Sequence, residues 1–418
     1  MRVGWFLALR QIRRSNKGTT GLIIFIMILT FLNLVVVSGL LVGLISGSFK
    51  QFRESYSGEV IITTSPGKAH IENSPALLDF LQSHPRVQAF SPRYSASVQV
   101  LGTLNDLPEK NERANRVGAR LTGIDPEKEE ILTGFSRFIK YGQGLEQGEE
   151  GYILIGANLI RKYSSFADAN IPGLDLLKDV DVGSRVRVTI TRTNGEIASK
   201  DFLVKGIVKS KVDEISTRMF ITDIELRRMF PVNQEQVQEI AIKTDYQRSP
   251  ELVAELKDFM GNNSARIQTT DEAVPSFLRD VETTMAVLGN ALSSIALVVA
   301  SITIFIVIFI NAVTKRKFIG IMKGIGISPK AIQLSYIMQA LFYGIVGSII
   351  GLFLTFVILE PYFIANPINF PFSDGILAVT TTGAMARVSI LIVVTFIAGF
   401  LPAKLIVRKN TLDSILGR

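Results

Sequence analysis

Apolar and polar positions are strongly segregated along this chain. Four long apolar runs stand out, at residues 21–48, 283–314, 331–359 and 388–407. The first three contain no charged residue, and the fourth contains only Lys404 near its end, where a long side chain can reach the membrane interface. About 20 apolar residues are enough to cross the hydrocarbon core of a bilayer. The pattern therefore predicts an α-helical membrane protein with four transmembrane helices.

The segment 49–282, between the first two apolar runs, has the pattern of a soluble α/β domain. Strands are predicted at 59–64, 95–101, 185–191, 202–208 and 240–243, and helices at 74–83, 158–163, 223–230 and 250–260. Ser74 followed by Pro75 favours a helix start. Asn194-Gly195 between two alternating runs predicts a tight β-hairpin, because its turn needs positive φ angles.

The basic residues lie beside the apolar runs and indicate the orientation. Residues 1–20, 315–330 and 401–418 together hold 14 of the 45 Lys and Arg but one of the 37 Asp and Glu. Positive charge in short segments next to membrane helices favours the cytoplasmic side. We therefore expect segments 1–20, 315–330 and 408–418 to be cytoplasmic, and segments 49–282 and 360–387 to be extracytoplasmic. The net charge of +8 is thus a topology signal, and nucleic acid is not an expected partner.

The composition excludes several kinds of chemistry. The chain has no cysteine, which excludes disulfides, thiolate catalysis and cysteine-ligated metal centres. Its two histidines, His70 and His84, have no carboxylate cluster beside them, so we interpret them as surface residues and expect no metal site.

No catalytic motif is present either. The sequence lacks a Gly-x-Ser-x-Gly elbow, a His-Glu-x-x-His pair and a phosphate-binding loop. The acidic stretches at 126–130 and 146–151 are interpreted as solvated turns. We expect a non-catalytic chain, and any ATP-driven action has to use another polypeptide.

Several local sequences, in this order and spacing, resemble one protein family. They are FLALRQIRR at 6–14, LTGIDPEKE at 121–129, YILIGANLI at 152–160, VGSRVRVTI at 182–190, TKRKFIGIMKGIGISPKAIQ at 314–333 and LPAKLIVRKNTLDSIL at 401–416. The chain resembles the MacB/LolC/LolE/FtsX superfamily of ABC transporter permeases over essentially its whole length. It is most similar to the lipoprotein-releasing permeases of the LolC/LolE type, although Thr411 stands where that family usually has proline.

The resemblance implies how such a chain works. Residues 1–20 would form an amphipathic helix on the cytoplasmic face, and 49–282 a MacB-like periplasmic core domain. The loop 315–330 would contact a separate ATPase subunit of the LolD or MacB type, which binds ATP and Mg²⁺, so that this chain holds no cofactor. The coupling residues would be Arg316, Lys317, Ile319, Gly320, Ile321, Met322, Gly324 and Gly326.

The resemblance also implies a dimer and a mode of action. Such permeases pair with a second copy or a paralogue in the inner membrane. ATP-driven motion at the coupling loop would travel along the long second span and change the shape of the outer domain, which is mechanotransmission. The substrate would be a lipoprotein, a lipid or another amphipathic molecule.

The apolar runs carry few polar side chains. No Asp, Glu, Arg or His lies in the middle of a span, so no ion pathway is marked. Asn33 and Asn311 are interpreted as helix–helix hydrogen-bonding residues. The small-residue spacing of Gly344, Gly347 and Gly351 predicts a close helix contact, within the chain or at a dimer interface.

Alternatives remain open on the sequence alone. LolC-type chains have a longer, proline-bearing loop at the hairpin tip that binds a periplasmic lipoprotein carrier. Here the hairpin closes at Asn194-Gly195, which leaves docking of a carrier open. One alternative function is an FtsX-like regulator of cell-wall hydrolases that moves no substrate, although the outer domain is larger than the usual FtsX one. Another is a membrane-anchored binding protein without an ATPase.

Overall fold

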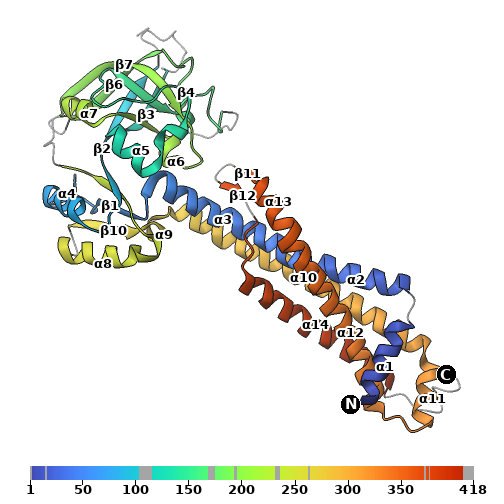
Figure 1. Cartoon of the computed structure of the whole chain (residues 1–418). Helices are drawn as coiled ribbons and strands as arrows, with labels where there is room; N and C mark the ends of the chain where they lie inside the picture. The colour runs from blue at the N-terminus through green and yellow to red at the C-terminus, as the bar shows by residue number, and fades with distance from the viewer. Residues whose placement is uncertain are drawn as a thin grey trace. The chain divides into compact units, whose positions relative to one another are not determined.

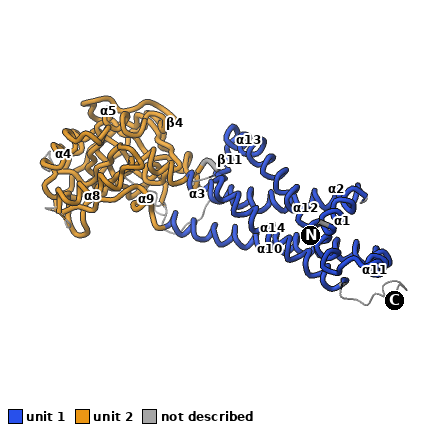
Figure 2. The backbone as a smooth tube through the Cα atoms, turned by 60° about the horizontal axis from the view of Figure 1, so that its bottom comes forward, with its two compact units in different colours: residues 1–47, 277–370, 374–418 blue, residues 48–276, 371–373 orange. Residues whose placement is uncertain are grey.

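The computed structural model describes residues 2–14, 17–102, 115–167, 175–192, 195–230, 236–261, 264–370, 373–375 and 377–407. The chain forms two compact units, coloured differently in Figure 2. Unit 1 consists of residues 1–47, 277–370 and 374–418, and unit 2 of residues 48–276 and 371–373. Unit 1 is mainly helical, whereas unit 2 is built around a β-sheet.

Four helices in the described chain are long and apolar enough to cross a membrane. The first runs from Lys17 to Ser57 through α2 (Lys17–Leu32), the π-helical turn η1 (Asn33–Val37), α3 (Ser38–Phe52) and the π-helical turn η2 (Arg53–Ser57). The others are α10 (Ser276–Thr314), α12 (Pro329–Phe353) continued by η6 (Leu354–Leu359) and α13 (Glu360–Ala365), and α14 (Thr381–Val407). These helices are longer than the apolar runs, because helical hydrogen bonding continues into polar segments. In the first of them, Lys50 and Glu54 form an i,i+4 ion pair beyond the apolar run.

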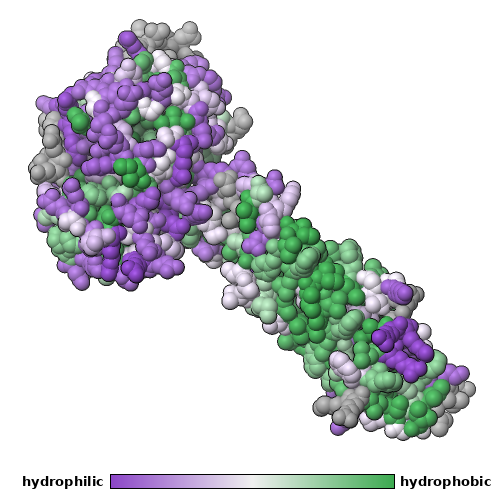
Figure 3. Space-filling view, in the orientation of Figure 1, coloured by the Kyte–Doolittle hydropathy of each residue, from purple (hydrophilic) through white to green (hydrophobic). Residues whose placement is uncertain are grey.

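Within unit 1, α12 packs against both α2 and α14 (Figure 1). Fully buried side chains from four helices form the core: Met27, Phe31, Ile304, Tyr336 and Leu391. The rest of unit 1 comprises α1 (Arg2–Arg13), α11 (Arg316–Gly324), β11 (Ile368–Phe370) and part of β12 (Ser373–Gly375). Figure 3 shows an almost continuous apolar surface over the middle of the long helices, which is the surface that hydrocarbon requires.

Unit 2 contains one continuous sheet with two lobes, and β2 (Ala89–Leu101) belongs to both. Lobe A consists of residues 89–93 of β2, β1 (Val60–Thr64), β9 (Glu239–Lys243) and β10 (Ala265–Thr269), in the antiparallel order β10-β1-β9-β2. Its helical elements are α4 (Ser74–Ser83), η5 (Tyr246–Arg248), α8 (Ser249–Met260) and α9 (Thr270–Ala273). Leu77, Leu81, Leu252 and Leu256 of α4 and α8 are buried against this sheet, which completes a split β-α-β arrangement.

Lobe B is inserted into the chain between β2 and β9. It consists of residues 94–101 of β2, β3 (Arg116–Ile124), β4 (Ile139–Gly142), β5 (Tyr152–Gly156), β6 (Arg185–Thr191), β7 (Ile197–Val208) and β8 (Arg218–Thr222). Its helical elements are α5 (Pro126–Thr133), η3 (Phe135–Phe138), η4 (Ala157–Leu159), α6 (Asp213–Ser216) and α7 (Asp223–Met229). Neighbouring pairs close a ring in the order β2-β3-β8-β5-β7-β6 around a core that includes Val188, Ile155 and Ile221.

The predicted strands are present, and β6 pairs with β7 as the predicted hairpin, from Thr191 opposite Ile197. The predicted two-residue turn at Asn194-Gly195 is wrong in length, because the backbone N–H of Arg192 donates to the carbonyl of Glu196 and three residues lie between them. Gly195 has a φ of 84°, and Asn194 lies outside the described residues. The helix predicted at 158–163 is wrong, because Ile160 leaves η4 and bridges to Leu177.

Three further interpretations need correction. The acidic stretch 126–130 is not a solvated turn, because it forms α5 and Glu129 is 2% exposed. His84 is not a simple surface residue: its Nε2 lies 2.9 Å from the carboxylate of Glu255, and its side chain is 11% exposed. Ser74 does not cap α4, since its hydroxyl donates to the carbonyl of Ile71 and the N-cap is the preceding residue.

Candidate functional site

Seven of the eight predicted coupling residues lie on a short helix, α11, and Gly326 lies in the turn that follows it. The helix and its C-cap residue Ile325 have two apolar faces. Ile319 is 1% exposed, and Met322 packs against the same core. Phe318, Ile321 and Ile325 are 66%, 45% and 73% exposed, and with 3.6 residues per turn they lie close together on one side of the helix. Ile319 and Met322 pack on their own chain, whereas Phe318 and Ile325 join Ile321 on the exposed face. Contact of the predicted coupling residues with a partner stays a prediction.

The position of α11 is determined by a tight turn and by a bond to α14. Gly326 has a φ of 91°, which a side chain would disfavour, and the backbone N–H of Ile327 donates to the carbonyl of Met322. Lys323 Nζ donates to the backbone carbonyl of Val407 at 2.5 Å. Gly320 is buried, whereas a Cβ on Gly324 would meet open space. Of the predicted glycines, Gly326 is thus the one that the turn requires.

Basic residues lie at the N-terminal end of the helix that carries the exposed face. Lys317 is exposed, and Lys315 and Arg316 are half-buried at the N-terminal end of α11. An exposed apolar surface bordered by cations is typical of an interaction site rather than of a loop that only fixes topology.

The predicted glycine contact lies within the chain. A Cβ on Gly347 would lie 2.5 Å from the Cβ of Met27, and one on Gly351 would collide with the ring of Phe31. Gly344 faces Thr395 of α14, with 3.1 Å from its ideal Cβ to the Cγ2 atom. Gly347 and Gly351 thus bring α12 against α2, and Gly344 brings it against α14.

The most polar membrane side chains have different surroundings. Asn33 is exposed and begins the π-helical turn η1, while Asn311 is half-buried. Arg387, which no sequence pattern singles out, lies one residue before the predicted fourth span and donates to the hydroxyl of Ser38 at 2.5 Å. Arg387 thereby connects α14 to the start of α3.

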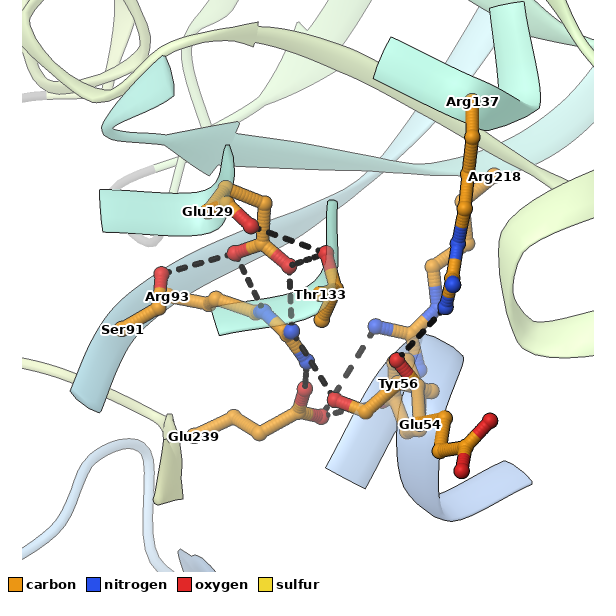
Figure 4. Close-up of polar contacts among 9 residues, drawn as sticks. All are labelled: Glu54, Tyr56, Ser91, Arg93, Glu129, Thr133, Arg137, Arg218 and Glu239. Carbon is orange, nitrogen blue, oxygen red and sulfur yellow. Dashed lines mark hydrogen bonds and ion pairs between the residues drawn. The ribbon is translucent and has the colours of Figure 1, made fainter. Parts of the chain in front are cut away.

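A buried charged cluster lies where the first long helix ends in unit 2 (Figure 4). We call it the joint, and it consists of Tyr56, Arg93, Glu129, Arg218 and Glu239. Each of these residues is 9% exposed or less. They come from η2, from β2 at the boundary of the two lobes, from α5, from β8 and from β9. The joint therefore connects the helix end with both lobes.

Arg93 is the centre of the joint. Its guanidinium donates to Glu129 with Nη2 at 2.5 Å and Nε at 3.1 Å, and to Glu239 with Nη1 at 2.8 Å. Nη2 also donates to the backbone carbonyl of Tyr56 at 2.9 Å. Two carboxylates balance the two arginines, and such pairing is what allows charges to be buried.

Glu129 and Arg218 of the joint have further polar contacts. Ser91 donates to Glu129 at 2.7 Å, and the Arg218 guanidinium lies 3.7 Å from Glu239. Burial by itself raises the pKa of Glu239, but the charges of Arg218 and Arg93 outweigh it and lower the pKa from 4.5 to about 2. Glu239 therefore stays ionised throughout the neutral range. Glu129 ends the stretch LTGIDPEKE, but no pattern in the sequence shows that the joint residues meet, because they are separated by up to 183 positions.

Acid is expected to weaken unit 2 through Glu239. Because its pKa is about 2 in the folded chain and 4.5 when unperturbed, the unfolded chain binds more protons between these pH values. The stabilisation is thus present above about pH 4.5 and is lost as the pH falls towards about 2. Thermal unfolding of the full chain and of the Glu239→Gln variant checks this. The stability difference between the two should shrink in acid, and a difference independent of pH would contradict the assignment.

A cavity of about 430 Å³ opens between the two lobes beside the joint. Thr64 and Lys68 line it from lobe A, Arg120 and Thr191 line it from lobe B, and Glu239 of the joint forms part of its wall. A change in the angle between the lobes would alter this cavity. Among the described residues, no group of three or more Asp, Glu or His is placed to hold a metal ion.

A protein-family model matches the part of unit 1 that follows residue 276 in the sequence. Residues 290–411 match the model of the FtsX-like permease C-terminal family. This match covers α11 and the whole of α12. The closer relationship to LolC/LolE-type chains stays a prediction.

Two solved structures are similar in part. The periplasmic region of MacB from Actinobacillus actinomycetemcomitans is 15% identical, with 54% of this chain and 94% of that chain covered and a TM-score of 0.32. The extracellular domain of the noncanonic ABC-type transporter YknZ from Gram-positive bacteria is 11% identical, with 50% and 99% covered and a TM-score of 0.31. A search of curated proteins found no match.

Proposed function

We propose that this chain is the membrane subunit of an ABC transporter and that α11 docks on a separate ATPase subunit. The observation that carries the proposal is the exposed apolar face of Phe318, Ile321 and Ile325 beside basic residues, within a segment that matches an FtsX-like permease. The partner would bind ATP and Mg²⁺ and perform the hydrolysis. This chain would be non-catalytic and hold no cofactor.

The helices provide a route for motion. α11 directly follows α10, whose 39 residues span about 58 Å at 1.5 Å per residue. The first long helix continues without a break from Lys17 to Ser57, so a displacement at one end of such a helix is felt at the other. ATP-driven movement at α11 would thus reach unit 2 as mechanotransmission. The chain would act in the inner membrane with both termini cytoplasmic, paired with a second copy or a paralogue.

The proposed substrate class fits the composition of the membrane helices. With no Asp, Glu, Lys, Arg or His in the middle of a span, a polar pathway through the bilayer is not favoured. We infer that unit 2 handles a lipoprotein, a lipid or another amphipathic molecule outside the membrane, with or without a periplasmic carrier. In the alternative, unit 2 regulates a cell-wall hydrolase, and no lipid or lipoprotein copurifies with the complex.

A charged residue on the exposed face of α11 tests the docking proposal. The Ile325→Glu variant should lose at least ~90% of the ATPase activity that copurifies with the tagged chain from membranes, because a carboxylate at a desolvated apolar contact costs several kcal/mol. Ile131→Glu is the matched control, since Ile131 is a similarly exposed isoleucine, at 64%, on α5 of unit 2. Equal ATPase recovery with both variants would refute docking through α11.

A further inference from the structure

The last turn of the first long helix carries Tyr56, and the side chains of Arg93 and Arg218 both contact its aromatic ring. The guanidinium carbons of Arg93 and Arg218 each lie 4.9 Å from the ring centroid of Tyr56. The Tyr56 hydroxyl donates to Glu239 at 2.5 Å and accepts from Arg218 Nη2 at 2.6 Å. Figure 4 shows the ring at the meeting point of these side chains. Both the face and the hydroxyl of Tyr56 are therefore engaged.

The partners of Tyr56 belong to different lobes. Glu239 lies on β9 of lobe A, and Arg218 lies on β8 of lobe B. Arg93 is the last residue of β2 that pairs with β9, and the next residue, Tyr94, already pairs with β3. Arg93 thus marks the point where the strand passes from one lobe to the other. A displacement of the Tyr56 ring acts on both lobes and on the strand between them.

Further bonds tie the helix end to the same two lobes. Arg137 of lobe B donates to the backbone carbonyl of Glu54 at 2.9 Å. The guanidinium of Arg53 lies 4.2 Å from the ring centroid of Tyr246 in lobe A. η2 is therefore held from both sides, and its movement cannot be absorbed by a flexible linker.

We propose that Tyr56 is the positioning residue through which the first membrane helix changes the angle between lobes A and B, and with it the cavity between them. The inference rests on the proposed function, because the ATPase supplies the motion. Its physical basis is that a fully bonded buried network tolerates few arrangements, so a small shift of the helix end is converted into a change of lobe angle rather than lost in local relaxation. The hydroxyl is the group to test, since it hydrogen-bonds both to Glu239 of lobe A and to the Nη2 of Arg218 of lobe B.

The natural absence of cysteine makes a direct test possible. Cysteines at Thr64 and Thr191 place one spin label on each lobe across the cavity. In the full chain bound to its ATPase in lipid nanodiscs, the distance between the labels should shift when ATP is trapped by vanadate. Tyr56→Phe keeps the ring and removes the hydroxyl, and it should lose at least about half of that shift while ATP hydrolysis and ATPase association stay within about twofold. Tyr141→Phe, an exposed tyrosine of lobe B, is the matched control and should keep the full shift.

Other outcomes are decisive as well. A full distance shift in Tyr56→Phe overturns the inference, and so does a wild-type complex that binds ATPase without any shift between the lobes. In both cases docking through α11 survives. If no ATPase associates with the wild-type chain, the proposed function and this inference fail together. Arg218→Lys keeps the charge beside Glu239 but cannot reproduce the guanidinium geometry, and it should show the same partial loss, so the test also stands if Tyr56→Phe folds poorly.

Discussion

The Arg93→Met chain is expected to lose about 3–5 kcal/mol of folding stability in unit 2, the cost of breaking a buried ion pair from one side. Arg93 makes hydrogen bonds to Glu129, Glu239 and the carbonyl of Tyr56. Methionine fills much of the same space but leaves two buried carboxylates with one remaining cation, Arg218. Hydrogen exchange of the β2 and β9 amides in the full chain measures the loss, because these strands are joined at Arg93.

Arg187→Met provides the comparison for this prediction. Arg187 pairs with Asp201 on the surface of lobe B at 2.8 Å, and its side chain is 38% exposed. Exposed pairs contribute at most about 1 kcal/mol, so this variant should exchange almost like the wild type. Similar losses in the two variants would show that the joint is no more important than a surface pair.

A leucine at Gly351 is expected to separate α12 from α2 and to destabilise unit 1 strongly. An ideal Cβ at this position already collides with the ring of Phe31, which is fully buried. Overpacking of this kind typically costs about 1–3 kcal/mol, and more when backbone elements have to move apart. Thermal unfolding of the purified chain in detergent should show a lowered midpoint for Gly351→Leu.

Gly21→Leu is the control for packing in the membrane helices. Gly21 lies on α2, and an added Cβ there meets no atom within 4 Å. Its unfolding midpoint should stay near that of the wild type. If Gly351→Leu were equally harmless, the close contact between α12 and α2 would be absent from the protein in solution.

The two regions that carry the proposals differ in how far the sequence could identify them. The basic, glycine-containing break between two apolar runs is visible in a local window, and its proposed role in coupling came from the resemblance to a family. The sequence does not show which of its apolar side chains are exposed: Ile319 and Met322 pack on their own chain, while Phe318 stays exposed. The residues of the joint share no local sequence pattern, because they come from distant parts of the chain.

The sequence by itself determined which segments are apolar enough to cross a membrane, that the intervening segment folds as an α/β domain, and where β6 turns into β7. These features depend on local properties: run length, alternation and the turn preference of Asn-Gly. The tertiary structure decided that Glu129 is buried beside Arg93 rather than solvated, that Gly347 and Gly351 contact α2 of the same chain, and that Tyr56 joins two lobes. Each of these contacts brings together residues far apart in the sequence, and their energy comes from desolvation and close packing, which exist only once the partners have met.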